Sequence, residues 1–286
     1  MEQFKSNWRK SWKAVWCLAL TFFIVGPPAL AQEDNTGTNP ANFTYDMRMY
    51  TEMADLDGEG SLVTSTFELR WPLGRNLANV TGAETGSLLY NLGTKTVMRI
   101  RARFKNLSIN TPGAEPFGTS EVSGIGDLDA RVLYMAYASR KFLLVVGAEG
   151  TFDTATNSAL GSGKTLFAPQ AFALFPGVLG GRSIFAPGYQ YVFDIAGDDD
   201  RSTVSRSQID LYFVWLLAGG KNWLIVDPQI VIDHENGTEP ALIEVEWGFL
   251  IAPAAGASGW IRPGVGIGKD KPYSWNFEAG LKFVWR

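Results

Sequence analysis

Apolar and polar residues alternate along most of this chain, and the alternation is clearest at its carboxyl end. Aromatic and aliphatic residues occupy one set of alternate positions there, namely Trp275, Phe277, Ala279, Leu281, Phe283 and Trp285. The intervening positions are mostly polar or small, namely Asn276, Glu278, Gly280, Lys282, Val284 and Arg286. Residues two apart share one face of a β-strand, so this segment predicts a strand with one apolar and one polar face.

Similar segments recur along the chain, separated by turn signals, and each is long enough to cross a bilayer when tilted. We expect strands at 43–54, 61–72, 95–107, 125–138, 141–153, 164–176, 183–196, 205–218, 221–234, 241–252, 258–268 and 274–286. Too little apolar sequence remains to cover so many apolar faces, and lipid is their natural cover. The pattern predicts an all-β fold, a transmembrane antiparallel up-and-down β-barrel of about 12 strands with its polar face inside. The alternative is a soluble periplasmic or secreted β-protein.

The lengths of the connections agree with this topology. An even number of strands places both termini on the periplasmic side, with short turns after even strands and longer loops after odd ones. The connections at 138–140 and 219–220 are short, whereas those at 107–123, 154–163 and 197–204 are longer. The segment 74–94 is long where a short turn is expected, so it holds a helix near 88–92 or the strand count is wrong there.

The first 31 residues have the organisation of a signal peptide. An apolar run at 14–25 is too short to span a membrane as a helix, and small residues at Ala29 and Ala31 suit a signal peptidase. Basic residues precede the run at Lys5, Arg9, Lys10 and Lys13. We therefore predict a cleavable signal peptide at 1–31 and a β-barrel domain at 32–286, exported to the cell outer membrane of a Gram-negative bacterium.

Composition excludes several classes of function. Cleavage removes four basic residues and Glu2, so the formal net charge falls from −4 to −7, which disfavours nucleic acid as a partner. The single cysteine, Cys17, lies in the leader, and His234 is the only histidine, so we expect no disulfide, no structural metal and no cofactor. The chain is 13% aromatic without a long uncharged apolar run after the leader, which is typical of a membrane barrel.

Charged residues share the polar face of three predicted strands. A basic residue on the lipid face costs about 2–4 kcal/mol near the bilayer midplane, so these side chains are expected to point into the lumen. The predicted pore-lining residues are Arg99, Arg101, Arg103, Lys105, Asp127, Asp129, Arg131, Glu244 and Glu246. We expect the basic row on 95–107 to meet Asp127 and Asp129 of the next strand and to create a transverse field across the lumen. The alternative for this row is a solvated edge of a soluble sheet.

Catalytic chemistry has only one candidate centre. Some outer-membrane barrels are lipid hydrolases that use serine and histidine at the rim, and His234 with Ser205 or Ser207 is the pairing available here. No Gly-x-Ser-x-Gly motif marks a nucleophile. We therefore predict no catalytic residue and no enzymatic activity.

Two short motifs resemble a signature of one barrel family. They are Ser123-Gly124-Ile125-Gly126-Asp127-Leu128 and Arg131-Val132-Leu133-Tyr134, with further agreement at 161–163, Pro169-Gln170, Asp210-Leu211-Tyr212 and Pro228. The family comprises outer-membrane transporters named for the meta-cleavage pathway of phenol degradation. The resemblance implies a barrel of about this size that acts as a channel for small, hydrophobic or aromatic molecules.

The expected function is therefore the passive passage of a small-molecule solute through an outer-membrane barrel. Its partners would be outer-membrane lipid, the solute and the outer-membrane assembly machinery. Two alternatives remain open at this stage, namely an outer-membrane lipid hydrolase and a closed barrel with a structural or adhesive role.

Overall fold

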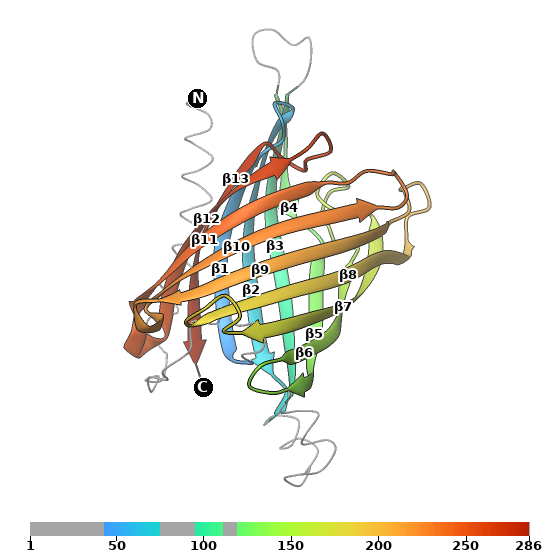
Figure 1. The fold of residues 1–286 in the computed structure, drawn as a ribbon. Helices are drawn as coiled ribbons and strands as arrows, with labels where there is room; N and C mark the ends of the chain where they lie inside the picture. Colours follow the sequence, from blue (N-terminus) through green and yellow to red (C-terminus); the bar gives the residue numbers. More distant parts are fainter. Residues whose placement is uncertain (1–42, 75–94, 111–118, 286) are drawn as a thin grey trace.

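The computed structural model describes residues 43–74, 95–110 and 119–285, which form a closed antiparallel β-barrel (Figure 1). The predicted fold class is thereby confirmed. The predicted signal peptide, the predicted helix near 88–92 and Arg286 lie outside the described residues.

Thirteen strand segments are found in the described part of the chain. They are β1 (Tyr45–Asp55), β2 (Gly60–Pro72), β3 (Thr96–Asn110), β4 (Thr119–Ile125), β5 (Leu128–Ala138), β6 (Leu143–Phe152), β7 (Lys164–Pro176), β8 (Ser183–Gly197), β9 (Ser205–Leu217), β10 (Asn222–Asp233), β11 (Ala241–Ala252), β12 (Ala257–Ile267) and β13 (Trp275–Trp285). Pairing of β1 with β13 and of β2 with β3 closes the sheet into a barrel.

The thirteen segments fill twelve positions in the barrel, because β4 and β5 both pair with β3. Phe104 pairs with Ile125 and Arg101 with Asp129, so the β4–β5 side holds one extra residue, as in a β-bulge. Because β3 continues to Asn110 and β4 begins at Thr119, the described residues of the predicted loop at 107–123 belong to strands.

The two ends of the barrel differ in their connections. One end, here called the turn end, holds the short connections 139–142, 177–182, 218–221 and 253–256 and the end of β13. The other, the loop end, holds 153–163, 198–204, 234–240 and 268–274. Gly219 and Gly220 have φ of 69° and 91°, a left-handed backbone that favours glycine in the tight turn before β10. The connection 56–59 is also short although it lies at the loop end, which departs from the predicted parity.

The outer face of the barrel is apolar, as the alternation predicts. On β3, Ile100 is 40% exposed whereas its neighbour Arg99 is 7% exposed, because successive side chains point to opposite faces. Aromatic rings near the turn end contact one another in series across β6–β9, with centroids 4.9–6.4 Å apart. The rings belong to Phe142, Phe175, Phe185, Phe213 and Trp215. Such a row suits the interface between lipid and water.

Among the described residues, no helix is long and apolar enough to cross a membrane.

Candidate functional site

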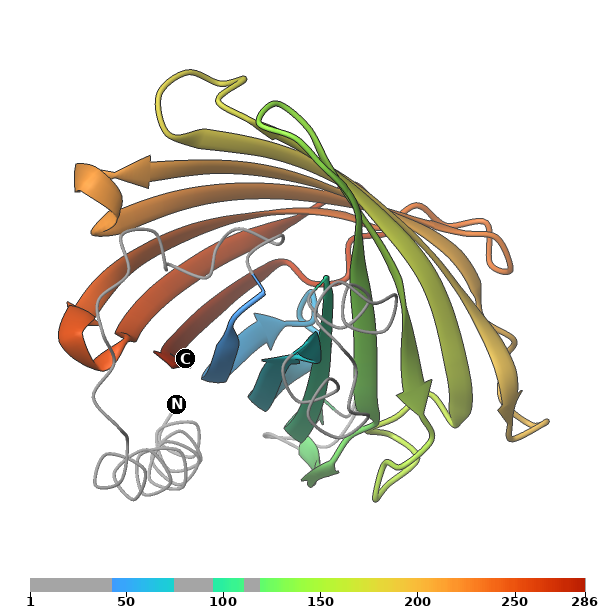
Figure 2. The same ribbon diagram turned by 90° about the horizontal axis from the view of Figure 1, so that it is seen from below.

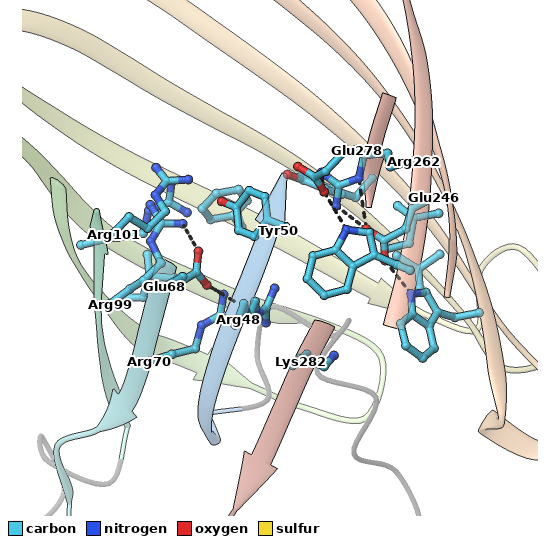
Figure 3. A pocket seen from close by; sticks show the side chains of 18 residues that line it. Arg48, Tyr50, Glu68, Arg70, Arg99, Arg101, Glu246, Arg262, Glu278 and Lys282 are labelled. Carbon is cyan, nitrogen blue, oxygen red and sulfur yellow. Dashed lines mark hydrogen bonds and ion pairs between the residues drawn. The ribbon is translucent and has the colours of Figure 1, made fainter. Parts of the chain in front are cut away.

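A cavity of about 220 Å³ lies inside the barrel (Figure 3). Side chains from β1–β3, β5, β7 and β9–β13 line it, so it occupies the lumen and not a groove between neighbouring strands. Viewed from below, β1–β3 lie across the opening from the sweep of β9–β11 (Figure 2). The walls on these two sides carry different charges.

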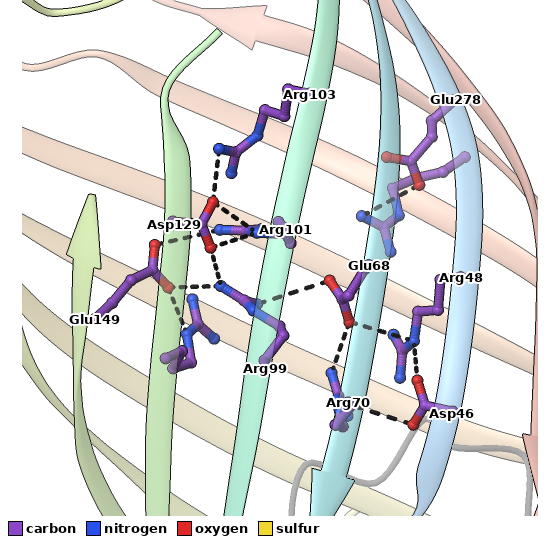
Figure 4. Close-up of polar contacts among 12 residues, drawn as sticks. Asp46, Arg48, Glu68, Arg70, Arg99, Arg101, Arg103, Asp129, Glu149 and Glu278 are labelled. Atoms are coloured by element: carbon purple, nitrogen blue, oxygen red, sulfur yellow. Dashed lines mark hydrogen bonds and ion pairs between the residues drawn. The ribbon is translucent and has the colours of Figure 1, made fainter. Parts of the chain in front are cut away.

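The first wall, here called the cationic wall, is formed by β1–β3, β5 and β6 (Figure 4). Arginines project from it at Arg48, Arg70, Arg99, Arg101, Arg103 and Arg131. Four carboxylates lie among them, at Asp46, Glu68, Asp129 and Glu149. These arginines outnumber these carboxylates six to four, and Lys105 and Glu52 on the same strands offset each other, so the wall carries a net positive charge.

Asp129 and Glu149 are the two centres at which most of these arginines meet. The Asp129 carboxylate lies 2.9 Å from Arg101 Nε and 2.6 Å from Arg103 Nη1. The Glu149 carboxylate lies 2.6 Å from both Arg99 Nη2 and Arg131 Nε. Removing water from such groups is costly unless each charge is paired, so the network holds the strands in one register.

The network continues towards β1 through Glu68. This buried carboxylate lies 3.2 Å from Arg70 Nη2 and 3.5 Å from Arg48 Nε. It also lies 4.0 Å from Arg99 Nη1, which joins the two halves of the cationic wall. Asp46 completes this half with a 2.9 Å contact to Arg48 Nε.

The second wall, here called the acidic wall, is formed by Glu244 and Glu246 of β11 and Glu278 of β13 around Arg262 of β12. Arg262 contacts Glu246 closely and lies 3.6 Å from Glu244 and 3.7 Å from Glu278. Two indole N–H groups also donate hydrogen bonds of 2.6 Å to these carboxylates, from Trp223 to Glu246 and from Trp260 to Glu278. Three carboxylates surround one cation here, so this wall carries a net negative charge.

All nine residues predicted to line the pore have inward-facing positions. Arg99, Arg101, Arg103, Asp129 and Arg131 belong to the cationic wall. Glu244 and Glu246 belong to the acidic wall, whose strands β11–β13 adjoin β1 of the cationic wall. The expected contact of the basic row with Asp129 of the next strand is found, and Glu244, Glu246 and Glu278 form a second group of carboxylates farther round the lumen.

Lys105 and Asp127 have a different role from the predicted one. The Asp127 carboxylate accepts hydrogen bonds from the backbone N–H groups of Thr154, at 3.2 Å, and Ser162, at 2.8 Å. Lys105 Nζ donates to the carbonyl oxygen of Leu160 at 2.8 Å. Both side chains thus hold the connection 153–163 against the inner wall near the loop end. Of the two carboxylates predicted to meet the basic row, Asp129 does so, whereas Asp127 binds the backbone of this loop.

Towards the turn end, the inner face of β6–β10 and β12 carries a buried apolar cluster, here called the apolar base. It consists of buried side chains at Val145, Phe172, Leu174, Ile184, Ala186, Val214, Trp223, Ile225 and Trp260. The Trp223 ring lies over Gly248, where a Cβ atom would be only 1.7 Å from the ring. Gly280 makes room for Trp260 in the same way. The expectation of a polar inner face therefore fails at this end of β6–β10, whereas Asp46, Arg70 and Lys282 keep it polar at the same end of β1, β2 and β13.

Several residues of the two walls were not among the predicted ones. These are Asp46, Arg48, Glu68, Arg70, Glu149, Arg262, Glu278 and Lys282. Each lies at an inward position of a segment predicted to be a strand, so the same alternation could have identified them. The indole donors Trp223 and Trp260 gave no such signal, because an inward tryptophan cannot be distinguished from a lipid-facing one by type.

The candidate catalytic pair lies on the outer face near the loop end. Ser207 Oγ is 3.0 Å from His234 Nε2 and 3.0 Å from the hydroxyl of Tyr189. Ser205 instead contacts the hydroxyl of Tyr191. In the described part of the chain, no carboxylate hydrogen-bonds to the His234 ring, so a group to orient it is lacking. No cluster of His, Cys, Asp and Glu residues suited to a metal ion occurs among the described residues.

No protein-family profile and no curated protein sequence matches this chain. Solved structures do resemble it in fold. An outer-membrane channel from Pseudomonas putida F1 has a TM-score of 0.57 at 14% identity, covering 87% of this chain and 99% of that one. The NanC porin has a TM-score of 0.50 at 10% identity, covering 84% and 98%. The outer membrane phospholipase A of Escherichia coli has a TM-score of 0.43 at 13% identity, covering 85% and 92%. At such identities, likeness concerns the fold alone.

Proposed function

We propose that this chain is a passive channel of the bacterial outer membrane, which admits a small solute to its lumen without covalent chemistry. The observation that carries the proposal is the cavity between a cationic and an acidic wall, inside a closed barrel whose outer face is apolar. A barrel of this strand number lies between small filled barrels and wide porins, so a narrow, selective path suits it. The similar fold of a solved channel and a porin supports this assignment.

The solutes we propose are small hydrophobic or aromatic molecules. The family resemblance implies this class and the link with phenol degradation, and the cavity lining is compatible with it. Leu133, Phe172, Val214 and Ile225 line the same cavity as the charged side chains, so an apolar body has a surface to contact. Outer-membrane lipid would cover the outward apolar side chains, and the assembly machinery would insert the exported barrel.

Planar-bilayer recordings with the purified mature protein test the proposal. We expect discrete conductance steps whose ion preference shifts towards cations when Arg99, Arg101 and Arg103 are all replaced with Ser. Arg140→Ser, at an exposed arginine in a short turn, is the matched control and should leave the preference unchanged. A gel comparing boiled and unboiled samples shows whether each variant folds. A folded wild-type protein that gives no steps would contradict the channel.

A rim hydrolase is the second candidate, favoured only by the 3.0 Å contact between Ser207 and His234. Purified protein would be given phospholipid and lipid A, with and without calcium, beside His234→Ala. We expect no hydrolysis by either protein, because no group orients the imidazole in the described part of the chain. Hydrolysis that disappears in His234→Ala would replace the channel assignment with an enzymatic one.

A further inference from the structure

Lys282 is a buried cation whose ammonium group has no carboxylate partner. Only 3% of the residue is exposed, and it projects from β13 into the cavity (Figure 3). Among the described residues, no carboxylate oxygen lies within ion-pairing distance of Lys282 Nζ, whose one specific contact is the Trp223 ring, 5.1 Å to its centroid. A buried charge is costly unless it is compensated, so this ammonium group requires an explanation.

A second cation lies directly beside it. Arg48 is the cross-strand partner of Lys282 in the pairing of β1 with β13, and both side chains line the cavity. Like charges placed opposite each other on one face of a sheet are destabilising. Glu68 and Asp46 offset the charge of Arg48, but they also serve Arg70. Lys282 and Arg48 therefore present two adjacent cationic groups to the cavity.

The same cavity offers apolar contacts to whatever the two cations bind. The Tyr50 and Trp260 rings, 5.9 Å apart, lie on the side of Lys282 and Arg48, and Phe172 lies in the wall facing them. At about 220 Å³ the cavity is smaller than the roughly 300–1,000 Å³ of pockets for drug-sized ligands. Its size thus suits a molecule built on a single ring.

We infer that the cavity binds a small aromatic carboxylate, with the carboxylate group at Lys282 and Arg48 and the ring against the neighbouring aromatic side chains. Asp46 and Glu246 act on the Lys282 ammonium group only from beyond ion-pairing distance, so the anion supplies the direct partner that it lacks among the described residues. This inference rests on the proposed channel function and narrows its solutes to amphipathic anions.

Binding of benzoate to the purified, folded protein in detergent tests the inference. Trp223 and Trp260 border the cavity, so tryptophan fluorescence and calorimetry both report the binding. Benzoate should bind at least about tenfold more tightly than neutral benzamide, since a hydrogen bond to a charged group contributes on the order of 1.5–3 kcal/mol. Acetate, which lacks the ring, should also bind more weakly than benzoate.

Variants of Lys282 locate the site. Lys282→Met should weaken benzoate binding about tenfold and leave benzamide binding unchanged, whereas Lys282→Arg keeps the charge and should retain binding. Lys269→Met, at a loop lysine whose side chain is 90% exposed, is the matched control and should bind benzoate like the wild type. Equal binding of benzoate and benzamide to the wild type would overturn the inference without any variant. If the protein conducts ions but does not bind benzoate, the inferred carboxylate site is wrong and the proposed channel function is still supported.

Discussion

The charged middle of the lumen and the apolar base beneath it belong to one barrel but are stabilised by different interactions. In the middle, arginines and carboxylates of β1–β3, β5 and β6 are buried only because they neutralise one another. At the base, Val145, Leu174 and Val214 are excluded from water by packing alone. We expect charge to determine which solutes the middle binds, and side-chain volume to determine which solutes pass the base.

The comparison predicts that the largest loss of stability follows from removing a carboxylate of the charged middle. Asp129 is 1% exposed and contacts three arginines, so Asp129→Ala removes the one carboxylate that contacts Arg103 in the described part of the chain and leaves Arg99 and Arg101 to Glu149 and Glu68. We expect the free energy of unfolding to fall by about 3–5 kcal/mol, measured by urea titration in detergent. Glu235→Ala, at an exposed loop carboxylate, is the control and should stay within about 0.5 kcal/mol. If Asp129→Ala unfolds at the wild-type urea concentration, mutual neutralisation does not hold this region together.

Creating a cavity in the apolar base should lower stability somewhat less than Asp129→Ala does. It should change the conductance of the barrel more. Leu174 is fully buried, so Leu174→Ala should cost about 2–5 kcal/mol, the lower part of this range applying if the base collapses around the gap. The same change widens the turn end, and we expect larger conductance steps in planar bilayers. Leu211→Ala makes the same substitution on the outer face of β9 and should leave conductance unchanged. Equal conductance in wild type and Leu174→Ala would show that the base does not limit passage.

An ion pair outside the lumen should show the smallest effect. Hydrogen bonds from Lys271 and Ser274 lower the pKa of Asp57, whose side chain is 60% exposed in the connection 56–59. Because the folded pKa is lowered, this pair contributes above the ordinary aspartate pKa of about 3.9, and the contribution disappears as pH falls through the lowered value. Lys271→Met should raise the Asp57 pKa, followed by carbon-detected magnetic resonance, while the urea midpoint at neutral pH barely changes. A large change in that midpoint would show that this exposed ion pair contributes as much to stability as the buried pairs do.

Most of the fold could be predicted from the sequence, because each strand has one face towards lipid and one towards the polar lumen. Residue type therefore alternates along the strand. A shift of one residue would move every charge into lipid, so register is strongly specified. The predicted segment 164–176 coincides with β7 and 241–252 with β11. The main failure is β4, where Gly124 and Gly126 beside the bulge remove the apolar contrast that marks a strand.

The candidate site could be predicted only in part, because alternation gives the face of a residue but not its partner. Arg99 and Asp129 were placed correctly on the inner face, yet the choice between Asp127 and Glu149 as partner depends on strand pairing and on a loop. The apolar base was missed for a different reason. Residues 223–226 are apolar on both faces, so the sequence there contains no contrast from which an inward side could be read.

The attachment of the connection 153–163 to the inner wall has a consequence for probing the cell surface. Lys105 and Asp127 bind its backbone and Leu160 is 2% exposed, so the end of this loop packs into the interior, whereas residues 156–159 are exposed. An epitope tag inserted beside Leu160 would have to displace a buried side chain. The exposed residues 235–237, which carry no such anchor, offer the better place for a surface label.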